Sequence, residues 1–379
     1  MSEFKRESIN NPTTKLNAEV DVESESSTQF ESRKRDHIRI ALDKRSQTFG
    51  QSGLDSVELI HEALPDLDFK EVDISTSFFF GRSLPVQLSS PLFISSMTAG
   101  HKNGQQINEA LARLSDRRQV LMGVGSQRRE LDDSSVSKEW TQVRKQAPQA
   151  LLIGNIGITQ LIKAPLAKIL KLLEATQALG LFVHVNSLQE VLQPEGTPSF
   201  KDSLRAISDL VKAVGMPVIV KEVGCGFSEQ TLKRLQDTGV FAVDLAGKGG
   251  THWGRVEGYR SQPEDLSYLI AQTFQNWGVS TVQSMLNARA AQVSFEVWAS
   301  GGVRSGLDVG KLLALGAKKV GLAKPFLEAI IQNDHVLPAD KADEQLEILL
   351  NRLEAELKIT MFCTGSEKLQ DLNMTKVNL

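Results

Sequence analysis

Short apolar runs alternate with longer segments of helical spacing through most of this chain. In the helical segments apolar residues recur every three or four positions, as in Leu166 to Leu173 and Leu204 to Val214. The short runs have the length and composition of strands. After Pro91 there are eight of them: Leu92–Met97, Val120–Val124, Leu151–Ile156, Phe182–Val185, Val218–Lys221, Phe241–Leu245, Val297–Gly301 and Lys319–Leu322.

Eight alternating strand and helix units predict an α/β fold, specifically a (β/α)8 TIM barrel closed by right-handed crossovers. A doubly wound open sheet is the alternative, because it shows the same alternation. Such a sheet would carry a Gly-x-Gly-x-x-Gly turn between its first strand and the following helix. No such turn occurs near the first run, so we favour the barrel.

The regions before and after the eight units predict additions to the barrel. Residues 1–30 are rich in Ser, Thr, Asn and Glu and lack apolar periodicity, which is typical of a disordered leader. We expect residues 31–379 to form a single domain. From Arg33 to Leu88, a helix followed by short strands between Val72 and Phe80 predicts an N-terminal cap, and Leu346–Met361 predicts a closing amphipathic helix.

One interval between strands is much longer than a barrel crossover needs. Residues 246–296 separate the sixth and seventh runs and include a glycine-rich stretch from Gly247 to Gly254. Long glycine-rich loops at the catalytic face of an enzyme often act as lids. The fold prediction therefore includes a long insertion after strand 6.

Composition limits the classes of partner. The 379 residues are 41% hydrophobic and 23% charged, which suffices for a large core, and the formal net charge of −3 gives no reason to expect nucleic acid binding. Cys225 and Cys363 have no paired metal-ligand spacing. Neither a signal peptide nor an apolar run of membrane-spanning length is present. We expect a soluble cytoplasmic protein with no membrane partner.

The stretch from His184 to Gly196 is the strongest candidate for a functional site. It gathers an imidazole, several amides and two carboxylates directly after the apolar run Leu181–Asn186. If that run is a buried parallel strand, these polar residues emerge at its C-terminal end, where barrel enzymes place catalytic groups. Such a cluster suits a charged ligand and proton chemistry.

Two glycine-containing loops predict a phosphate site. Ser300–Gly306 follows the seventh run and Ala323–Phe326 follows the eighth. In barrels these two loops often bind phosphate through glycine amides and a helix N-terminus. A pair of ordinary tight turns is the alternative, and the placement at both expected strands favours phosphate.

Other residues at the predicted barrel mouth suit a flavin ring. Lys221 ends the fifth run, where it either reaches solvent or faces an anionic partner. Small and amide residues end the first three runs, in Ser95–Gly100, Gly123–Arg128 and Gly154–Gly157. Together with the late phosphate loops, these residues predict a pocket for flavin mononucleotide (FMN), with the phosphate at strands 7 and 8.

A basic cluster, Arg33–His37, lies where the predicted order begins. It is either a solvated helix start or, together with Arg128, a clamp for a diphosphate.

These motifs together resemble the type 2 isopentenyl diphosphate isomerases, which are FMN-dependent barrel enzymes. The resemblance runs from about Arg33 to the C-terminus. Its marks are Arg33-Lys34-x-x-His37, Met97-Thr98, Met122–Arg128, His184-x-Asn186-x-x-Gln189-Glu190 with Gln193–Gly196, and Gly249-Gly250-Thr251-x-Trp253. Ala99 replaces the first glycine of the family's usual Met-Thr-Gly-Gly turn, which is a conservative change.

The resemblance implies roles for individual residues. FMN contacts fall on Met97, Thr98, Ala99, Ser126, Asn155, Lys221, Thr251, Gly301, Gly302, Arg304, Ala323 and Lys324. Substrate contacts fall on Arg33, Lys34, His37, Ser126, Gln127, Arg128, His184, Asn186 and Gln189. Glu190 matches a Mg²⁺ ligand, and Gln189 and His184 are the catalytic candidates.

The resemblance also implies an activity in isoprenoid biosynthesis. Family members interconvert isopentenyl and dimethylallyl diphosphate with reduced FMN and Mg²⁺, use NADPH as the usual reductant, and form tetramers or octamers. A reduced flavin beneath the alkene would stabilise a carbocation-like centre. An amide is a weak acid or base, so Gln189 either transfers a proton or only positions the substrate.

Three other interpretations compete with this one: a flavin-dependent oxidase, a nucleotide dehydrogenase, and a binding module without catalytic activity. An FMN-dependent 2-hydroxy acid oxidase would carry a histidine base after strand 6, where this chain has Gly247-Lys-Gly-Gly250. An inosine monophosphate dehydrogenase would carry its cysteine in that loop, whereas Cys225 follows strand 5. The density of polar residues after strand 4 disfavours a non-catalytic module.

Overall fold

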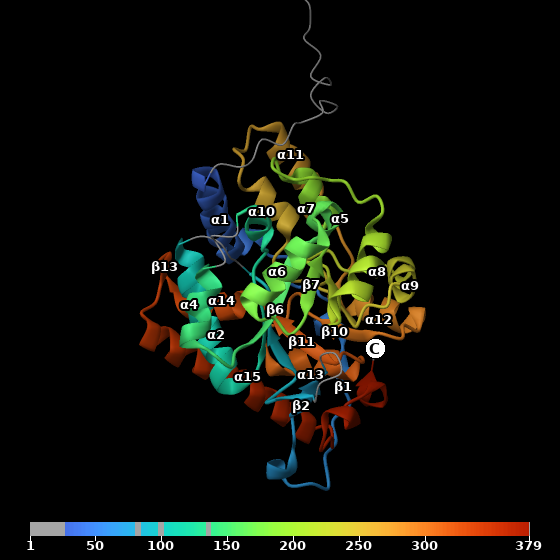
Figure 1. Ribbon diagram of the computed structural model, residues 1–379. Helices are drawn as coiled ribbons and strands as arrows, with labels where there is room; N and C mark the ends of the chain where they lie inside the picture. Colours follow the sequence, from blue (N-terminus) through green and yellow to red (C-terminus); the bar gives the residue numbers. More distant parts are fainter. Residues whose placement is uncertain (1–26, 80–84, 98–101, 134–137, 379) are drawn as a thin grey trace, which may run out of the picture.

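The parallel barrel that the alternation predicts is present and closed. The computed structural model describes residues 27–79, 85–97, 102–133 and 138–378. Its barrel strands follow one another in chain order, and β11 pairs with β4 to close the ring (Figure 1). The strands are β4 (Leu92–Ile94), β5 (Leu121–Gly123), β6 (Leu151–Gly157), β7 (Leu181–His184), β8 (Val218–Lys221), β9 (Ala242–Asp244), β10 (Glu296–Ala299) and β11 (Lys319–Leu322).

The predicted strand bounds differ from the observed ones mainly at the carboxyl ends. β8 and β11 have the predicted bounds, but β4 ends at Ile94 and β10 ends at Ala299. The residues predicted to extend these two strands, up to Met97 and Gly301, leave the ladder and contribute to a cavity. Apolar periodicity cannot locate that departure, because small and apolar residues suit both a strand end and a pocket wall.

Alternate residues of the strands fill the inside of the barrel. Phe93, Phe182 and Trp298 point into one buried cluster, whereas their neighbours along the strands pack outward against the helices. The Trp298 ring lies 5.2 Å from that of Phe93 and 6.1 Å from that of Phe182, measured between centroids. Phe78, from the hairpin of β2 (Thr76–Phe78) and β3 (Val86–Leu88), joins this cluster. The aromatic side chains make the barrel interior a packed core, and barrels of this kind bind their ligands at the carboxyl-terminal mouth.

Helices cover the outside of the barrel. The principal ones are α2 (Lys102–Arg118), α4 (Lys138–Gln146), α6 (Leu166–Thr176), α8 (Ser203–Val214), α9 (Glu229–Gln236), α12 (Thr281–Ala291), α13 (Gly306–Ala314), α14 (Lys324–Ile330) and α15 (Ala339–Phe362). Short helices α3 (Arg128–Asp132), α5 (Ile158–Lys163) and α7 (Ser187–Leu192) follow β5, β6 and β7 at the mouth. The predicted closing helix is confirmed as α15, which packs on α2, α13 and α14.

The remaining elements are short. They are η2 (Lys44–Ser46), η3 (Leu54–Ser56), β1 (Glu58–Leu59), η4 (Phe69–Glu71), β12 (Ile331–Gln332), β13 (His335–Val336), η6 (Leu369–Asp371), η7 (Met374–Lys376) and β14 (Val377–Asn378). β1 pairs with β14, so the N-terminal region and the C-terminal end of the chain are tied together. Among the described residues, none of the helices has the length and hydrophobicity that a bilayer crossing requires.

The N-terminal cap and the insertion meet above the barrel mouth. Helix α1 (Ser27–Leu42) packs on α10 (Trp253–Gly258) and on α14, and Figure 1 shows α1 in blue beside α10. Residues 1–26 of the predicted leader lie outside the described residues, and residues 27–30 open α1. The insertion contains α10, α11 (Leu266–Thr273) and α12, of which α12 is the ordinary barrel helix beside α9.

We expect Trp298→Ala to lower the free energy of unfolding by about 3–5 kcal/mol, because it removes a large, fully buried side chain from the barrel interior. Chemical denaturation followed by far-UV circular dichroism measures this change. Trp277→Ala is the matched control, since Trp277 is 58% exposed and its removal should cost no more than about 0.5 kcal/mol. Equal destabilisation by the two substitutions would contradict the packing argument.

Candidate active site

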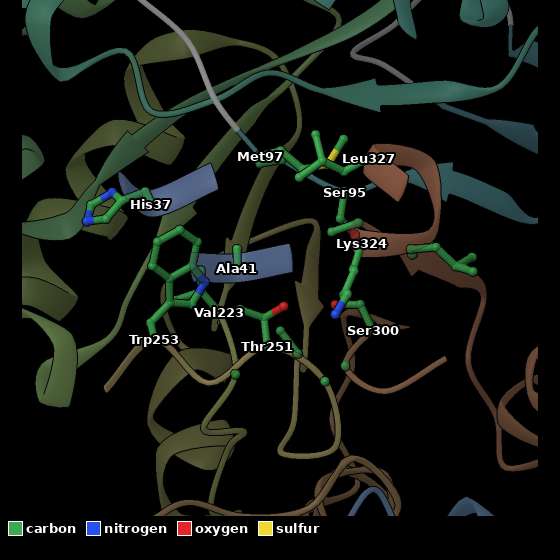
Figure 2. A pocket seen from close by; sticks show the side chains of 18 of the residues that line it. His37, Ala41, Ser95, Met97, Val223, Thr251, Trp253, Ser300, Lys324 and Leu327 are labelled. Carbon is green, nitrogen blue, oxygen red and sulfur yellow. The ribbon is translucent and has the colours of Figure 1, made fainter. Parts of the chain in front are cut away.

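A cavity of about 510 Å³ lies at the carboxyl-terminal mouth of the barrel. Figure 2 shows it with His37 and Trp253 on one side and Ser300 and Lys324 on the other. The residues predicted for the site that line it are Arg33, Lys34, His37, Met97, Ser126, Arg128, Asn155, His184, Gln189, Glu190, Lys221, Thr251, Gly301, Gly302, Arg304, Ala323 and Lys324. Residues from nearly every barrel loop and from α1 therefore meet in one place.

Two of the predicted residues that the structure describes, Gln127 and Asn186, do not line this cavity. Thr98 and Ala99 lie outside the described residues. Gln127 is buried below the mouth, where its Oε1 accepts a hydrogen bond from the Asn155 backbone N–H at 3.0 Å. Asn186 is the N-cap of α7, and its Oδ1 accepts from the Gln189 backbone N–H at 2.7 Å. Both side chains position neighbouring site residues, and their direct contact with substrate stays a prediction.

The basic cluster of α1 faces the cavity. Arg33, Lys34 and His37 are each less than 10% exposed, although they belong to three charged residue types that normally lie at the surface. Their spacing places them on one face of the helix. The interpretation as a solvated helix start is therefore wrong, and the cations line the same cavity as Arg128.

His184, at the end of β7, is held in one tautomer. Asn155 donates from Nδ2 to the Val124 carbonyl at 3.0 Å, so its Oδ1 is the atom that accepts from His184 Nδ1 at 2.9 Å. This leaves Nε2 of His184 as the acceptor nitrogen. Burial lowers the pKa of His184 to about 3, and the positive charges of Lys221 and Lys34 act in the same direction. His184 is therefore a neutral imidazole at neutral pH.

Gln189 is anchored by a buried carboxylate that the sequence did not single out. Its Nε2 donates to Oε1 of Glu257, on α10, at 3.1 Å. The same oxygen lies 3.0 Å from His37 Nε2, and Arg260 donates to the other oxygen at 2.7 Å. Burial raises the pKa of Glu257, but His37 and Arg260 outweigh it and bring the pKa to about 2. Glu257 is therefore an ionised carboxylate inside the site.

Glu257 has a weak local signal in the sequence, which does not predict its burial. It follows Trp253 by four positions on a short helix, so both side chains lie on one face of α10. Glu257 is 3% exposed, and a buried carboxylate beside a cavity is a functional candidate. The insertion therefore supplies an acidic group as well as a cover.

Lys221, at the end of β8, faces a carboxylate and does not reach solvent. Its side chain is buried, Nζ donates to the Glu222 carbonyl at 2.8 Å, and Asp244 Oδ2 lies 3.9 Å away. The Glu222 carboxylate accepts from the backbone N–H groups of residues 223–225, so it is occupied elsewhere. Burial lowers the pKa of Lys221, and Asp244 opposes that shift.

The loops after β10 and β11 have the features of a phosphate site. Gly301 and Gly302 have φ values of 97° and 81°, a conformation that suits glycine and brings this loop against the backbone of Gly247 and Gly249. Arg304 donates to the Gly302 and Gly249 carbonyls, both at 2.8 Å. Lys324 Nζ donates to the Leu42 carbonyl of α1 at 2.9 Å.

The hydroxyl groups beside the cavity also fit a planar polar ligand. Ser95 Oγ and Ser96 Oγ are buried and have no hydrogen-bond partner among the described residues, although both residues line the cavity. Buried hydroxyl groups normally have partners, so these two are free to bind a ligand. The residues present therefore fit FMN.

Glu190 lies on α7, next to Gln189. It lines the cavity, and its Oε2 accepts from the Thr197 backbone N–H at 2.8 Å. The described residues contain no group of three His, Cys, Asp or Glu side chains that would hold a metal by themselves. A single carboxylate suits Mg²⁺ when substrate phosphate and water complete the octahedron.

The histidine and cysteine that could serve as catalytic groups of the competing enzyme classes are both buried outside the cavity. His252, beside the glycine loop, is fully buried, with Nδ1 accepting from the Arg255 backbone N–H and Nε2 2.9 Å from the Trp277 carbonyl. Cys225 is buried, and burial raises its pKa, so it is not a thiolate nucleophile. Neither residue lines the cavity.

Solved structures of similar fold include a flavocytochrome and oxidases, one of them a mandelate oxidase variant with an FMN adduct. A flavocytochrome b2 variant with benzoylformate is 20% identical, with a TM-score of 0.63 over 89% of this chain and 80% of that one. A lactate oxidase from Pediococcus acidilactici is 14% identical, with a TM-score of 0.59 over 90% and 92%. These likenesses confirm the barrel, and identities this low carry the fold alone.

The family model and the sequence relatives identify the family more specifically than the solved structures do. The FMN-dependent dehydrogenase family model matches residues 159–379. Proteins named isopentenyl-diphosphate delta-isomerase are 68% identical in Bdellovibrio bacteriovorus (93% of this chain, 99% of the relative) and 48% identical in Legionella pneumophila strain Corby (91% and 97%). One from Halobacterium salinarum is 41% identical over 93% and 94%. The chain therefore belongs to the isopentenyl-diphosphate delta-isomerase family, in its FMN-dependent type 2 branch.

Proposed function

We propose that this protein interconverts isopentenyl diphosphate and dimethylallyl diphosphate with reduced FMN and Mg²⁺, in isoprenoid biosynthesis. One observation carries the proposal: the cations of α1, the Gln189 side chain held by Glu257 behind it, and the loops suited to FMN meet at one cavity, which Glu257 itself does not line. A substrate whose diphosphate lies at α1 would then present its alkene to both the amide and the cofactor.

FMN would be held with its phosphate at the loops after β10 and β11. Gly301, Gly302, Arg304, Ala323 and Lys324 would contact the phosphate end, and Met97, Thr98, Ala99, Ser126, Asn155, Lys221 and Thr251 would contact the remainder. Bound reduced FMN would supply an electron-rich ring that stabilises positive charge on the alkene and exchanges a proton. Lys221, with Asp244 as its counter-ion, would place a cation beside that ring.

The substrate diphosphate would be bound by Arg33, Lys34, His37, Ser126, Gln127, Arg128, His184, Asn186 and Gln189. The α1 cations are already ordered against the cavity, which lowers the entropic cost of binding an anion. The neutral His184 would accept a hydrogen bond at Nε2 or take up a proton there as the diphosphate arrives.

Gln189 is the side chain that we place at the reacting alkene. Glu257 holds its Nε2, which leaves Oε1 as its acceptor atom. Glu257 is thus a positioning residue for Gln189, and its negative charge would stabilise positive charge that develops nearby. Burial of α1 and α10 over the mouth would exclude water, which would otherwise capture a carbocation-like centre.

Other parts of the proposal rest on the family. NADPH would reduce the flavin, Glu190 would bind Mg²⁺ together with the diphosphate, and the chain would form a homo-oligomer, a tetramer or octamer. Residues 31–379 would act as one FMN-binding domain. Cys225 and Cys363 are both free thiols, which suits work in a reducing cytoplasm.

An isomerase assay tests the proposal directly. Purified protein should be yellow, and it should convert isopentenyl to dimethylallyl diphosphate only when FMN is reduced by NADPH or dithionite and Mg²⁺ is present. Product formation is followed by mass spectrometry after acid hydrolysis of the allylic product. Turnover of lactate or another 2-hydroxy acid, with no isomerisation under reducing conditions, would favour the oxidase class instead.

Glu190→Gln tests the metal assignment. We expect the Mg²⁺ concentration for half-maximal activity to rise at least about tenfold, because a charged ligand is lost, while the flavin content stays unchanged. Mg²⁺ titration of activity in both proteins measures the shift. Glu229→Gln, which changes an exposed carboxylate on α9, is the control. Superimposable titration curves for Glu190→Gln and the unmodified protein would mean that the carboxylate serves only the Thr197 backbone.

Glu257→Gln tests the anchoring of Gln189. We expect kcat to fall about 100-fold with little change in FMN content, because His37 and Arg260 lose their buried counter-charge and Gln189 loses a charged acceptor. Steady-state kinetics separates kcat from KM. Glu195→Gln is the matched control, since Glu195 binds the outer side of the same Arg260 and should have a smaller effect. An unchanged kcat in Glu257→Gln would contradict this role.

A further inference from the structure

A half-exposed aromatic ring lies at the rim of the cavity, apart from the hydrophobic core. Phe49 lines the cavity and is 51% exposed. Leaving a phenyl side chain this exposed forgoes much of the free energy that burial would give. Neither the sequence motifs nor the catalytic roles proposed above involve this residue, so its position calls for another explanation.

The backbone on both sides of Phe49 is fixed. Residues 46–52 form a strap along the glycine-rich loop after β9. The Thr48 N–H donates to the Gly250 carbonyl at 2.9 Å, and the Gly249 N–H donates to Thr48 Oγ1 at 2.8 Å. At the end of the strap, the Val282 N–H donates to the Ser52 carbonyl at 2.9 Å. The exposed ring therefore extends from a rigid support.

Two cations from different loops face this one ring. The Arg304 guanidinium carbon lies 4.7 Å from the ring centroid, and Lys324 Nζ lies 6.0 Å from it. Arg304 follows β10 and Lys324 follows β11, the two loops with the features of a phosphate site. Both distances are within the range in which a ring attracts a cation through its negative face.

The ring leaves the hydrogen-bonding edge of Arg304 available. The hydrogen bonds from Arg304 to the Gly302 and Gly249 carbonyls use two of the five N–H groups of the guanidinium. A ring contact takes the flat face of the group, whereas phosphate oxygens bind along its edge. Phe49 and a phosphate can therefore contact Arg304 at the same time.

We propose that Phe49 is a positioning residue for the flavin phosphate: its ring holds Arg304 and Lys324 side by side at the cavity so that both meet one phosphate group. The proposal rests on the FMN site proposed above. Two like charges close together repel each other, and the ring offsets that repulsion before the phosphate arrives. The consequence is selective retention of a phosphorylated flavin.

Comparison of FMN with riboflavin tests this role, because riboflavin lacks the phosphate. Apoprotein is titrated with each flavin, and quenching of flavin fluorescence gives Kd. We expect Phe49→Ala to raise Kd for FMN about tenfold, as the loss of two moderate cation–ring contacts implies, and to leave Kd for riboflavin unchanged. Phe49→Leu, which keeps apolar bulk without the ring's charge distribution, should resemble Phe49→Ala.

Trp277→Ala, which removes another exposed aromatic side chain, is the control and should change neither Kd. An unchanged Kd for FMN in Phe49→Ala, equal weakening of both flavins, or full affinity in Phe49→Leu would each overturn the proposal. If the unmodified protein binds riboflavin as tightly as FMN, the phosphate site itself fails, which is a distinct result from failure of Phe49 alone.

Discussion

Closure of the barrel between its first and last strands is the constraint on which the site depends. β4 and β11 pair in parallel, with Gly321 opposite Phe93. A side chain at Gly321 would overlap the Phe93 ring, so glycine there makes room for an aromatic residue in the barrel interior. Closure brings the loop after β11 next to the loop after β4, although more than 200 residues separate them in the chain. Without it, the two sides of the cavity would not meet.

The closed barrel then concentrates buried charge at its mouth, and each charge is offset by a neighbour. Lys221 faces Asp244 across adjacent strands, and the register of β8 and β9 sets that pairing. Glu257, on α10, is offset by two partners. Arg260 follows the end of α10, and His37 comes from α1. Charges buried without such partners would be strongly unfavourable. The polar site is stable because strands fix one pair and the cap and insertion fix the other.

The sequence predicts the barrel well because strand periodicity and strand order are local and repetitive. The positions of the residues at the ends of β4 and β10 depend on where the backbone leaves the ladder, and small or apolar residues such as Ser95, Ser96 and Met97 are compatible with both outcomes. Site residues at the carboxyl ends of strands, such as His184 and Lys221, are predictable from topology.

Glu257 and Asp244 were missed for different reasons. The burial of Glu257 depends on α10 meeting α1, a contact between segments about 200 residues apart that no local pattern encodes. Asp244 lies inside a run that reads as an ordinary buried strand, and only the register with Lys221 gives it a partner. For Gln127 and Asn186 the motif predicted contact with the ligand. In the folded loops, both amide oxygens instead accept hydrogen bonds from backbone N–H groups.

Helix α1 connects the two halves of the site. Near its middle, His37 contacts Glu257, which anchors Gln189 on the substrate side. At its end, the Leu42 carbonyl accepts a hydrogen bond from Lys324, on the side with the phosphate loops. Helix carbonyls at a C-terminus carry partial negative charge, so a lysine is a favourable partner there. A phosphate that drew Lys324 away would release this end of α1, and a substrate diphosphate on Arg33 and Lys34 would hold the middle of the helix. The placement of α1 thus responds to both the flavin phosphate and the substrate diphosphate. The N-terminal cap is therefore a functional part of the site as well as its cover.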